Sequence, residues 1–131
     1  MFGKKNTKKK KQANIMIVED DALLCRALAA AFSGEGFQTE CVGNGLEVEE
    51  AVKKQAPDLI LLDLILPGLD GFAVLKQLKS ETKTASIPVV IISNLGSAAD
   101  VKSAKSLGAE AYFIKANSEI SQIIDYVKNL L

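Results

Sequence analysis

The sequence predicts one α/β domain, a doubly wound five-stranded parallel sheet with helices on both faces. Three observations support this prediction. The 131 residues suffice for one ordinary domain. Short apolar runs alternate five times with segments of helical periodicity, a pattern typical of parallel strands joined by right-handed helical crossovers. Three of the runs consist almost entirely of Ile, Leu and Val, as expected for strands buried on both faces.

Each predicted strand is a short apolar run that ends at polar or turn-forming residues. The first run stops at Glu19, the second stops at the turn formed by residues 43–45, and Pro88 opens the fourth. The predicted strands are residues 15–18, 37–42, 59–62, 89–92 and 111–114.

The predicted helices lie between these strands and after the last one. The first helix stops at Gly34, and Gly108 caps the weaker fourth helix. The last helix has the clearest apolar stripe, because its isoleucines, valine and leucine recur at helical spacing. The predicted helices are residues 22–33, 46–55, 72–78, 98–107 and 118–131.

The formal net charge of zero combines two oppositely charged parts. Residues 1–13 hold six lysines and no acid, which predicts a disordered basic tail. Residues 14–131, the predicted domain, hold 10 basic and 16 acidic residues and therefore carry a net charge of −6. The tail either only solubilises the protein or weakly contacts an anionic surface, such as lipid, nucleic acid or the domain itself.

The composition excludes several classes of site. Without histidine, the chain cannot hold a Ser-His-Asp or Cys-His catalytic group, an imidazole-ligated zinc ion or a proximal-histidine haem. The longest apolar run is too short to span a bilayer and no secretion signal is evident, so we expect a cytoplasmic protein. Cys25 and Cys41 are the only cysteines. They could form a disulfide, but we expect two free thiols.

Chemically active side chains follow four of the five predicted strands. Because the carboxyl ends of parallel strands meet at one edge, these side chains are expected to converge. Each residue taken singly is more typical of a turn, a cap or a solvated charge, but together they indicate a site. They are Glu19 and Asp20 after the first strand, Asp63 after the third, Ser93 and Asn94 after the fourth, and Lys115 after the fifth.

Three neighbouring carboxylates repel one another unless a cation lies among them. Oxygen ligands favour a hard cation such as Mg²⁺. A carboxylate beside such a metal is a plausible phosphoryl acceptor, because its attack forms an acyl phosphate. The metal and a lysine would then offset the charge on the phosphoryl oxygens.

Four stretches of the chain carry a family resemblance. They are IMIVEDD at 15–21, PDLILLDLILPGLDG at 57–71, PVVIIS at 88–93 and GAEAYFIK at 108–115. With these motifs, residues 14–131 resemble a bacterial response-regulator receiver domain over their whole length. The resemblance implies a flavodoxin-like (βα)5 fold with strand order 2-1-3-4-5.

The resemblance also assigns roles to the acidic residues. Asp63 would be the phospho-accepting aspartate. Glu19 and Asp20 would be the acidic pair that positions Mg²⁺, with Asp63 and the backbone carbonyl of Ile65 as further ligands.

Four other residues would contact or sense the phosphoryl group. Ser93 would be the switch hydroxyl, Lys115 would pair with a phosphoryl oxygen, and Tyr112 would be the aromatic rotamer switch. Asn94 stands where the family usually has a small residue, and would either narrow access to Asp63 or donate a hydrogen bond to the phosphoryl group.

The chain departs from the family pattern at three further positions. Ala116 replaces the usual proline after the lysine, which predicts a trans peptide bond or a strained one. Ile65 and Leu95 occupy positions that influence hydrolysis in this family. Neither side chain can orient an attacking water, so we expect slow autodephosphorylation.

The resemblance implies a phosphodonor that supplies the histidine, either a histidine kinase or a histidine phosphotransfer protein. No DNA-binding motif is evident, and the downstream effector is unknown. Signalling would use the surface of the fourth helix, fifth strand and fifth helix, which is also a candidate homodimer interface.

One alternative function is that of an unphosphorylated receiver-like adaptor. An aspartyl phosphatase ranks lower, because Ile65 stands where such enzymes carry a second aspartate.

Overall fold

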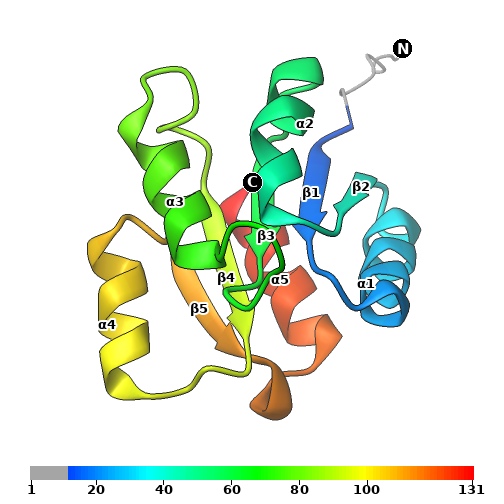
Figure 1. Cartoon of the computed structure of the whole chain (residues 1–131). Coiled ribbons are helices and arrows are strands. Elements are labelled where there is room, and N and C mark those ends of the chain that lie inside the picture. The colour runs from blue at the N-terminus through cyan, green and yellow to red at the C-terminus, as the bar shows by residue number, and fades with distance from the viewer. Residues whose placement is uncertain (1–11) are drawn as a thin grey trace.

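The computed structural model describes residues 12–131 and confirms the predicted sheet (Figure 1). All the pairings are parallel and the strand order is β2-β1-β3-β4-β5. The predicted basic tail lies almost entirely outside the described residues. The strands are β1 (Asn14–Val18), β2 (Gln38–Val42), β3 (Leu59–Leu62), β4 (Val89–Ser93) and β5 (Ala111–Ile114).

The helices follow the predicted order, with shifted ends. The helix expected at residues 46–55 begins as a 3-10 turn, because the Asn44 side chain caps Leu46 N–H ahead of it. The last helix begins later than expected, because Glu119 and Gln122 form a capping box. The helices are α1 (Ala22–Gly34), η1 (Gly45–Glu47), α2 (Val48–Lys54), α3 (Gly71–Ser80), α4 (Ala98–Ser106), η2 (Lys115–Asn117) and α5 (Ile120–Leu130).

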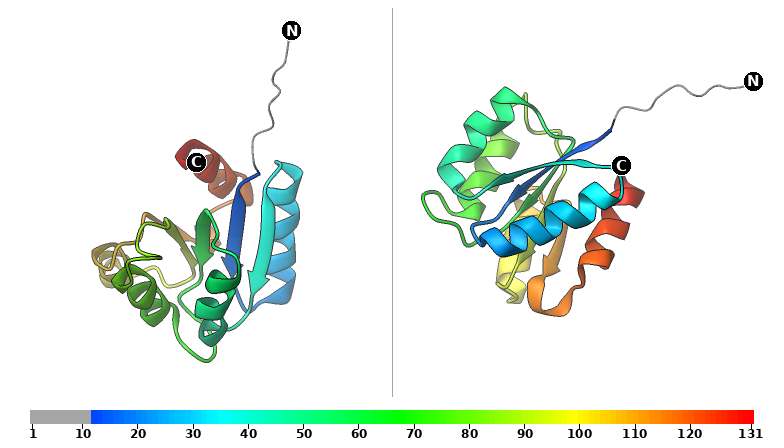
Figure 2. Two further views of the ribbon diagram at one scale, coloured as in Figure 1. Left: turned by 90° about the horizontal axis from the view of Figure 1, so that it is seen from above. Right: turned by 90° about the vertical axis from the view of Figure 1, so that its right-hand side faces the viewer.

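The sheet separates two layers of helices, as Figure 2 shows, and a separate apolar cluster fills the space on each face. Alternate strand residues point to opposite faces. Ile15 and Ile17 pack with α1 and α5, whereas Met16 and Val18 pack with α2, α3 and α4. The strands β1, β3 and β4 are almost completely buried, which explains their continuous apolar composition. No helix within residues 12–131 has the length and apolar character needed to cross a membrane.

The expectation of two free thiols is wrong, because a disulfide joins Cys25 of α1 to Cys41 of β2. Their Cα atoms are 6.3 Å apart, within the range that disulfides span. The spacing of 16 residues does not show this proximity. It arises because α1 folds back along β1 and β2, the strands that flank it in the chain.

Gly71 allows the start of α3 to pack directly against the end of β3. Its N–H donates to the carbonyl oxygen of Leu64 at 2.9 Å. A Cβ at this position would collide with the backbone of Asp63 and Leu64. The close approach therefore requires glycine, and it sets the position of the loop that follows Asp63.

We expect Gly71→Ala to lower the free energy of unfolding by about 1–3 kcal/mol, the usual cost of overpacking. Gly34→Ala is the matched control, because among the described residues a Cβ there would meet no atom within 4 Å outside its own helix, and the residue is helical. That variant should gain roughly 0.5 kcal/mol. Urea denaturation measures both changes, and equal stabilities of the two variants would contradict the proposed collision.

Candidate functional site

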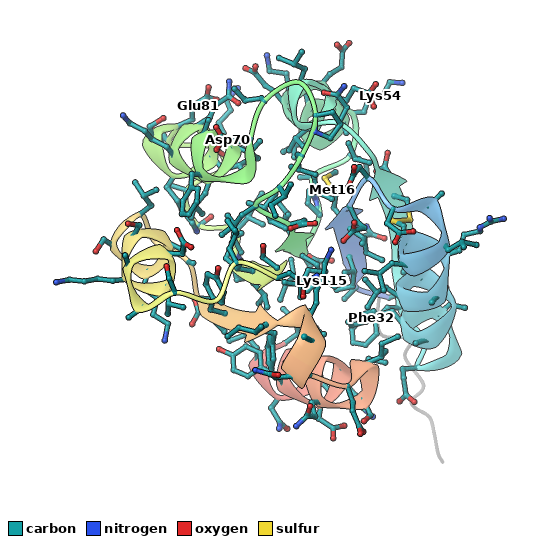
Figure 3. The ribbon with its side chains drawn as sticks, turned by 60° about the horizontal axis from the view of Figure 1, so that its bottom comes forward. Met16, Phe32, Lys54, Asp70, Glu81 and Lys115 are labelled. Carbon is teal, nitrogen blue, oxygen red and sulfur yellow. A yellow bond between two sulfur atoms is a disulfide. The ribbon has the colours of Figure 1, made fainter. Side chains whose placement is uncertain are left out.

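The predicted site residues lie at the carboxyl edge of the sheet. Figure 3 looks toward this edge, with Lys115 near its centre. Backbone hydrogen bonding continues one residue past the ends of β1 and β3. Glu19 N–H donates to the Val42 carbonyl oxygen at 2.9 Å, and Asp63 N–H donates to the Val18 carbonyl oxygen at 3.0 Å. The backbones of these two acidic residues are therefore held by the sheet itself.

The structure brings the three acidic residues together. Each of Glu19, Asp20 and Asp63 offers a carboxylate oxygen, and these oxygens lie within 4.8 Å of one another. Glu19 is 2% exposed and Asp63 is 3% exposed, whereas Asp20 faces solvent. The cluster arises because β1 and β3 are neighbours whose last residues, Val18 and Leu62, are paired.

Lys115 crosses from the end of β5 to the two buried carboxylates. Its Nζ lies 2.7 Å from Glu19 Oε1 and 2.8 Å from Asp63 Oδ2. One ammonium thus faces two carboxylates, and the third carboxylate of the cluster adds further negative charge. Among the described residues no peptide bond is cis, so the Lys115–Ala116 bond is trans.

Burial and charge shift the pKa values of this cluster. Burial raises the pKa of Glu19 above its usual 4.5, outweighing the hydrogen bonds from Lys115 and Asp21; the charge of Asp63 raises it further. Burial opposes the Lys115 ammonium, but the hydrogen bonds and charges of Asp63 and Glu19 raise its pKa above the usual value. The site therefore keeps the Lys115 ammonium charged, but this single positive charge does not balance the charge of the three carboxylates.

The remaining carboxylate oxygens differ in their partners. Asp63 Oδ1 accepts a hydrogen bond from Ile65 N–H at 3.1 Å, and Glu19 Oε2 accepts one from Asp21 N–H at 3.0 Å. Glu19 Oε1 is buried and, within the described residues, has no hydrogen-bond donor besides the ammonium 2.7 Å away. Such a buried, incompletely satisfied oxygen fits a cation ligand.

The predicted switch residues form a separate group beside the acidic cluster. The Ser93 hydroxyl is buried and accepts a hydrogen bond from Leu95 N–H at 3.3 Å. The Tyr112 hydroxyl donates to the Leu95 carbonyl oxygen. Burial and the nearby charges of Asp100 and Asp63 raise the pKa of Tyr112, so it stays protonated and able to donate.

Two of the predicted residues lie at the solvent side of the site. Asn94 is exposed directly after Ser93. Ile65 is 55% exposed, although its backbone N–H contacts Asp63. Gly71 also supports the site but was not among the residues predicted from the sequence, because its close approach to Asp63 depends on the packing of α3. Its signal was the glycine at the end of the PGLDG segment.

The raised pKa of Glu19 predicts the effect of removing its charge. A group whose pKa is raised by folding contributes stability below its unfolded pKa and loses that contribution as pH rises through the folded pKa. Without added metal, Glu19→Gln should therefore raise the melting temperature at pH 7 to 8 by a few degrees, with the gain vanishing below pH ~4.5. Thermal melts across this range test it.

Glu81→Gln is the control for that experiment, because Glu81 is an exposed glutamate outside the cluster. It should leave the melting temperature nearly unchanged throughout. A Glu19→Gln protein less stable than the natural protein at pH 8 would show that the Lys115 ion pair outweighs burial, contrary to this reading.

Two curated relatives match this chain closely. Sporulation initiation phosphotransferase F of Bacillus subtilis is 38% identical over 117 residues, covering 89% of this chain and 92% of that protein. DNA-binding response regulator MtrA of Mycobacterium tuberculosis is 37% identical over 101 residues, covering 77% of this chain and 43% of that protein. The chain thus spans less than half the length of the MtrA proteins.

Solved structures of response regulators share the fold. A putative response regulator from Chloroflexus aurantiacus superposes with a TM-score of 0.85 at 26% identity, covering 92% of this chain and 98% of that chain. The Mn²⁺-bound form of response regulator Rcp1 superposes with a TM-score of 0.77 at 25% identity, covering 90% and 91%. Divalent metal is therefore bound by a protein of this fold.

The profile of the response regulator receiver domain matches residues 15–128. This match spans almost the whole chain and includes every predicted site residue. Together with the strand order and the relatives at 37–38% identity, it shows that the chain belongs to the response regulator receiver family.

Proposed function

We propose that this protein is a phospho-accepting signalling switch that receives a phosphoryl group on Asp63. The observation that supports this most directly is the buried carboxylate pair of Glu19 and Asp63, held by Lys115 at the edge where parallel sheets bind ligands. The phosphodonor is a histidine kinase or a histidine phosphotransfer protein. The chain has no histidine of its own, which fits the acceptor role.

A divalent cation, which we propose to be Mg²⁺, would be held by the carboxylates of Glu19, Asp20 and Asp63 and by the backbone carbonyl of Ile65. The incompletely satisfied Glu19 Oε1 and the exposed Asp20 carboxylate support this ligand set. When bound, the cation supplies positive charge that offsets the repulsion among the carboxylates and the charge of the phosphoryl oxygens.

In the transfer step, an Asp63 carboxylate oxygen attacks the phosphorus of the donor phosphohistidine. The new P–O bond forms as the P–N bond breaks, and the electron pair returns to the imidazole nitrogen of the donor. Lys115 then exchanges its bond to Asp63 Oδ2 for one to a phosphoryl oxygen. The N–H of Ile65, which already contacts Asp63 Oδ1, keeps the carboxyl group oriented.

The switch step uses the Ser93, Leu95 and Tyr112 group. A phosphoryl group on Asp63 would draw the Ser93 hydroxyl toward it and shift the loop at Leu95. Because the Tyr112 hydroxyl donates to the Leu95 carbonyl oxygen, this shift would release or reorient Tyr112. The α4-β5-α5 surface would then change, and it serves as the binding surface for an unidentified effector or for a second copy of the chain.

We propose that the protein acts in the cytoplasm, where the phosphohistidine of a histidine kinase would be accessible to it. The lysine-rich segment 1–13 would add weak, salt-dependent contacts to anionic surfaces.

The second candidate function is a receiver-like adaptor that is never phosphorylated. Asn94, exposed beside Ser93 where the family has a small residue, is the observation that favours it.

Incubation with acetyl phosphate or phosphoramidate and Mg²⁺ should add one phosphoryl group, detected by intact-mass spectrometry. Asp63→Asn should abolish the adduct, because the amide is a poor nucleophile. Asp125→Asn, which changes an exposed aspartate of α5, should leave it intact. Absence of an adduct on the natural protein would favour the adaptor, and sustained phosphoester hydrolysis would favour a phosphatase.

The phosphorylated protein should dephosphorylate slowly, because the exposed Ile65 side chain at the mouth of the site cannot orient water. Ile65→Gln should shorten the lifetime of the aspartyl phosphate several-fold, measured by mass spectrometry after donor removal. Leu46→Gln is the control, because Leu46 is exposed but follows β2 rather than β3. A natural lifetime of seconds that Ile65→Gln does not shorten would contradict this expectation.

A further inference from the structure

The Cys25–Cys41 disulfide has no part in the proposed phosphotransfer. It joins α1 to β2, the strand at one edge of the sheet, and is drawn as a yellow bond between them in Figure 3. Because β2 pairs with β1 alone among the strands of residues 12–131, the disulfide is a covalent restraint on a strand that has one neighbour there.

The acidic loop, residues 19–21, connects β1 to α1. Each cysteine of the disulfide is linked to one end of this loop. On one side, Cys25 N–H donates to the Asp21 carbonyl oxygen at 2.9 Å, in the first turn of α1. On the other side, Cys41 precedes Val42, whose carbonyl oxygen accepts from Glu19 N–H. The disulfide and these two hydrogen bonds thus close a ring of which the acidic loop is one side.

The acidic loop needs such a restraint more than an ordinary loop does. Its Glu19 and Asp20 carboxylates lie within 4.8 Å of each other and of Asp63, so electrostatic repulsion acts to separate them. Without the disulfide, the restraints on this loop are the ion pair of Glu19 with Lys115, the hydrogen bonds of Glu19 and Asp21 and the cap on α1.

The two sulfur atoms differ in access. Cys25 is 3% exposed, whereas Cys41 is exposed to solvent. A dithiol reductant can therefore attack Cys41 Sγ, and Cys25 leaves as a thiolate that takes up a proton. A second attack within the reductant releases Cys41, so the reductant is oxidised to its own disulfide and the protein gains two thiols.

We propose that the Cys25–Cys41 disulfide is a redox-sensitive brace that holds the acidic loop in the geometry that binds a divalent cation. Reduction loosens the loop and weakens cation binding, and thereby slows phosphorylation of Asp63. The cation part of this inference rests on the proposed function. In the cytoplasm, where disulfides are usually transient, such a brace would form under oxidising conditions.

Reduction should leave the fold intact, because the buried side chains of Leu28 and Phe32 pack α1 against the sheet by apolar contacts that do not require the disulfide. Cys41→Ser is the variant of choice, since it breaks the disulfide at the exposed partner and leaves the buried Cys25 in place. The full chain is compared as oxidised protein, dithiothreitol-reduced protein and Cys41→Ser. A thiol reagent applied to denatured protein verifies the thiol count of each.

Hydrogen exchange is the first measurement. The amides of Glu19, Asp21 and Cys25 should exchange several-fold faster in reduced protein and in Cys41→Ser than in oxidised protein. Amides of β3 and β4 should be unchanged, which excludes global loosening. Dithiothreitol should have no effect on Cys41→Ser. Equal exchange of the three loop amides in oxidised and reduced protein would overturn the proposal, as would free thiols in protein kept under oxidising conditions.

Calorimetric titration with Mg²⁺ is the second measurement. Oxidised protein should bind Mg²⁺ roughly three- to tenfold more tightly than either form without the disulfide, a difference of about 0.7–1.4 kcal/mol. Equal affinities would overturn the proposal. If no form binds Mg²⁺ while reduction still accelerates loop exchange, the brace is supported and the proposed cation site is what fails.

Discussion

The functional edge of this receiver domain depends on the interaction of one lysine with two buried carboxylates. Lys115 lies 2.7–2.8 Å from oxygens of Glu19 and Asp63, both almost fully buried. Buried charges are costly unless they are paired, and one ammonium does not neutralise the three carboxylates that meet here. The excess negative charge explains why the arrangement suits a bound cation better than it suits a purely structural ion pair.

The sheet makes this unfavourable cluster possible. Glu19 and Asp63 continue the hydrogen bonding of β1 and β3 by one residue, so their backbones cannot move apart without breaking the sheet. The apolar layers on both faces supply the packing that holds the charges in place. Past Glu19 and Asp63, the loops at this edge lie beyond the hydrogen bonding of the sheet, and these are the segments that we propose respond to phosphorylation or to the redox state.

Much of the fold and of the candidate site was predictable from local pattern. Runs composed almost entirely of Ile, Leu and Val indicate β1, β3 and β4, because strands buried on both faces typically have that composition. The convergence of Glu19, Asp63 and Lys115 followed from parallel strands ending at one edge. Helix ends were less predictable, since the caps at Asn44 and Glu119 depend on side-chain hydrogen bonds that compete with the apolar periodicity.

The sequence by itself determined the α/β class, the family and the residue types at the ends of the strands, because these depend on composition and spacing along the chain. The tertiary structure alone decided three other features. These are the pairing of Cys25 with Cys41, the need for glycine at position 71 and the hydrogen bond from Tyr112 to Leu95. Each depends on how separate elements pack against one another, so packing determines it and local pattern does not.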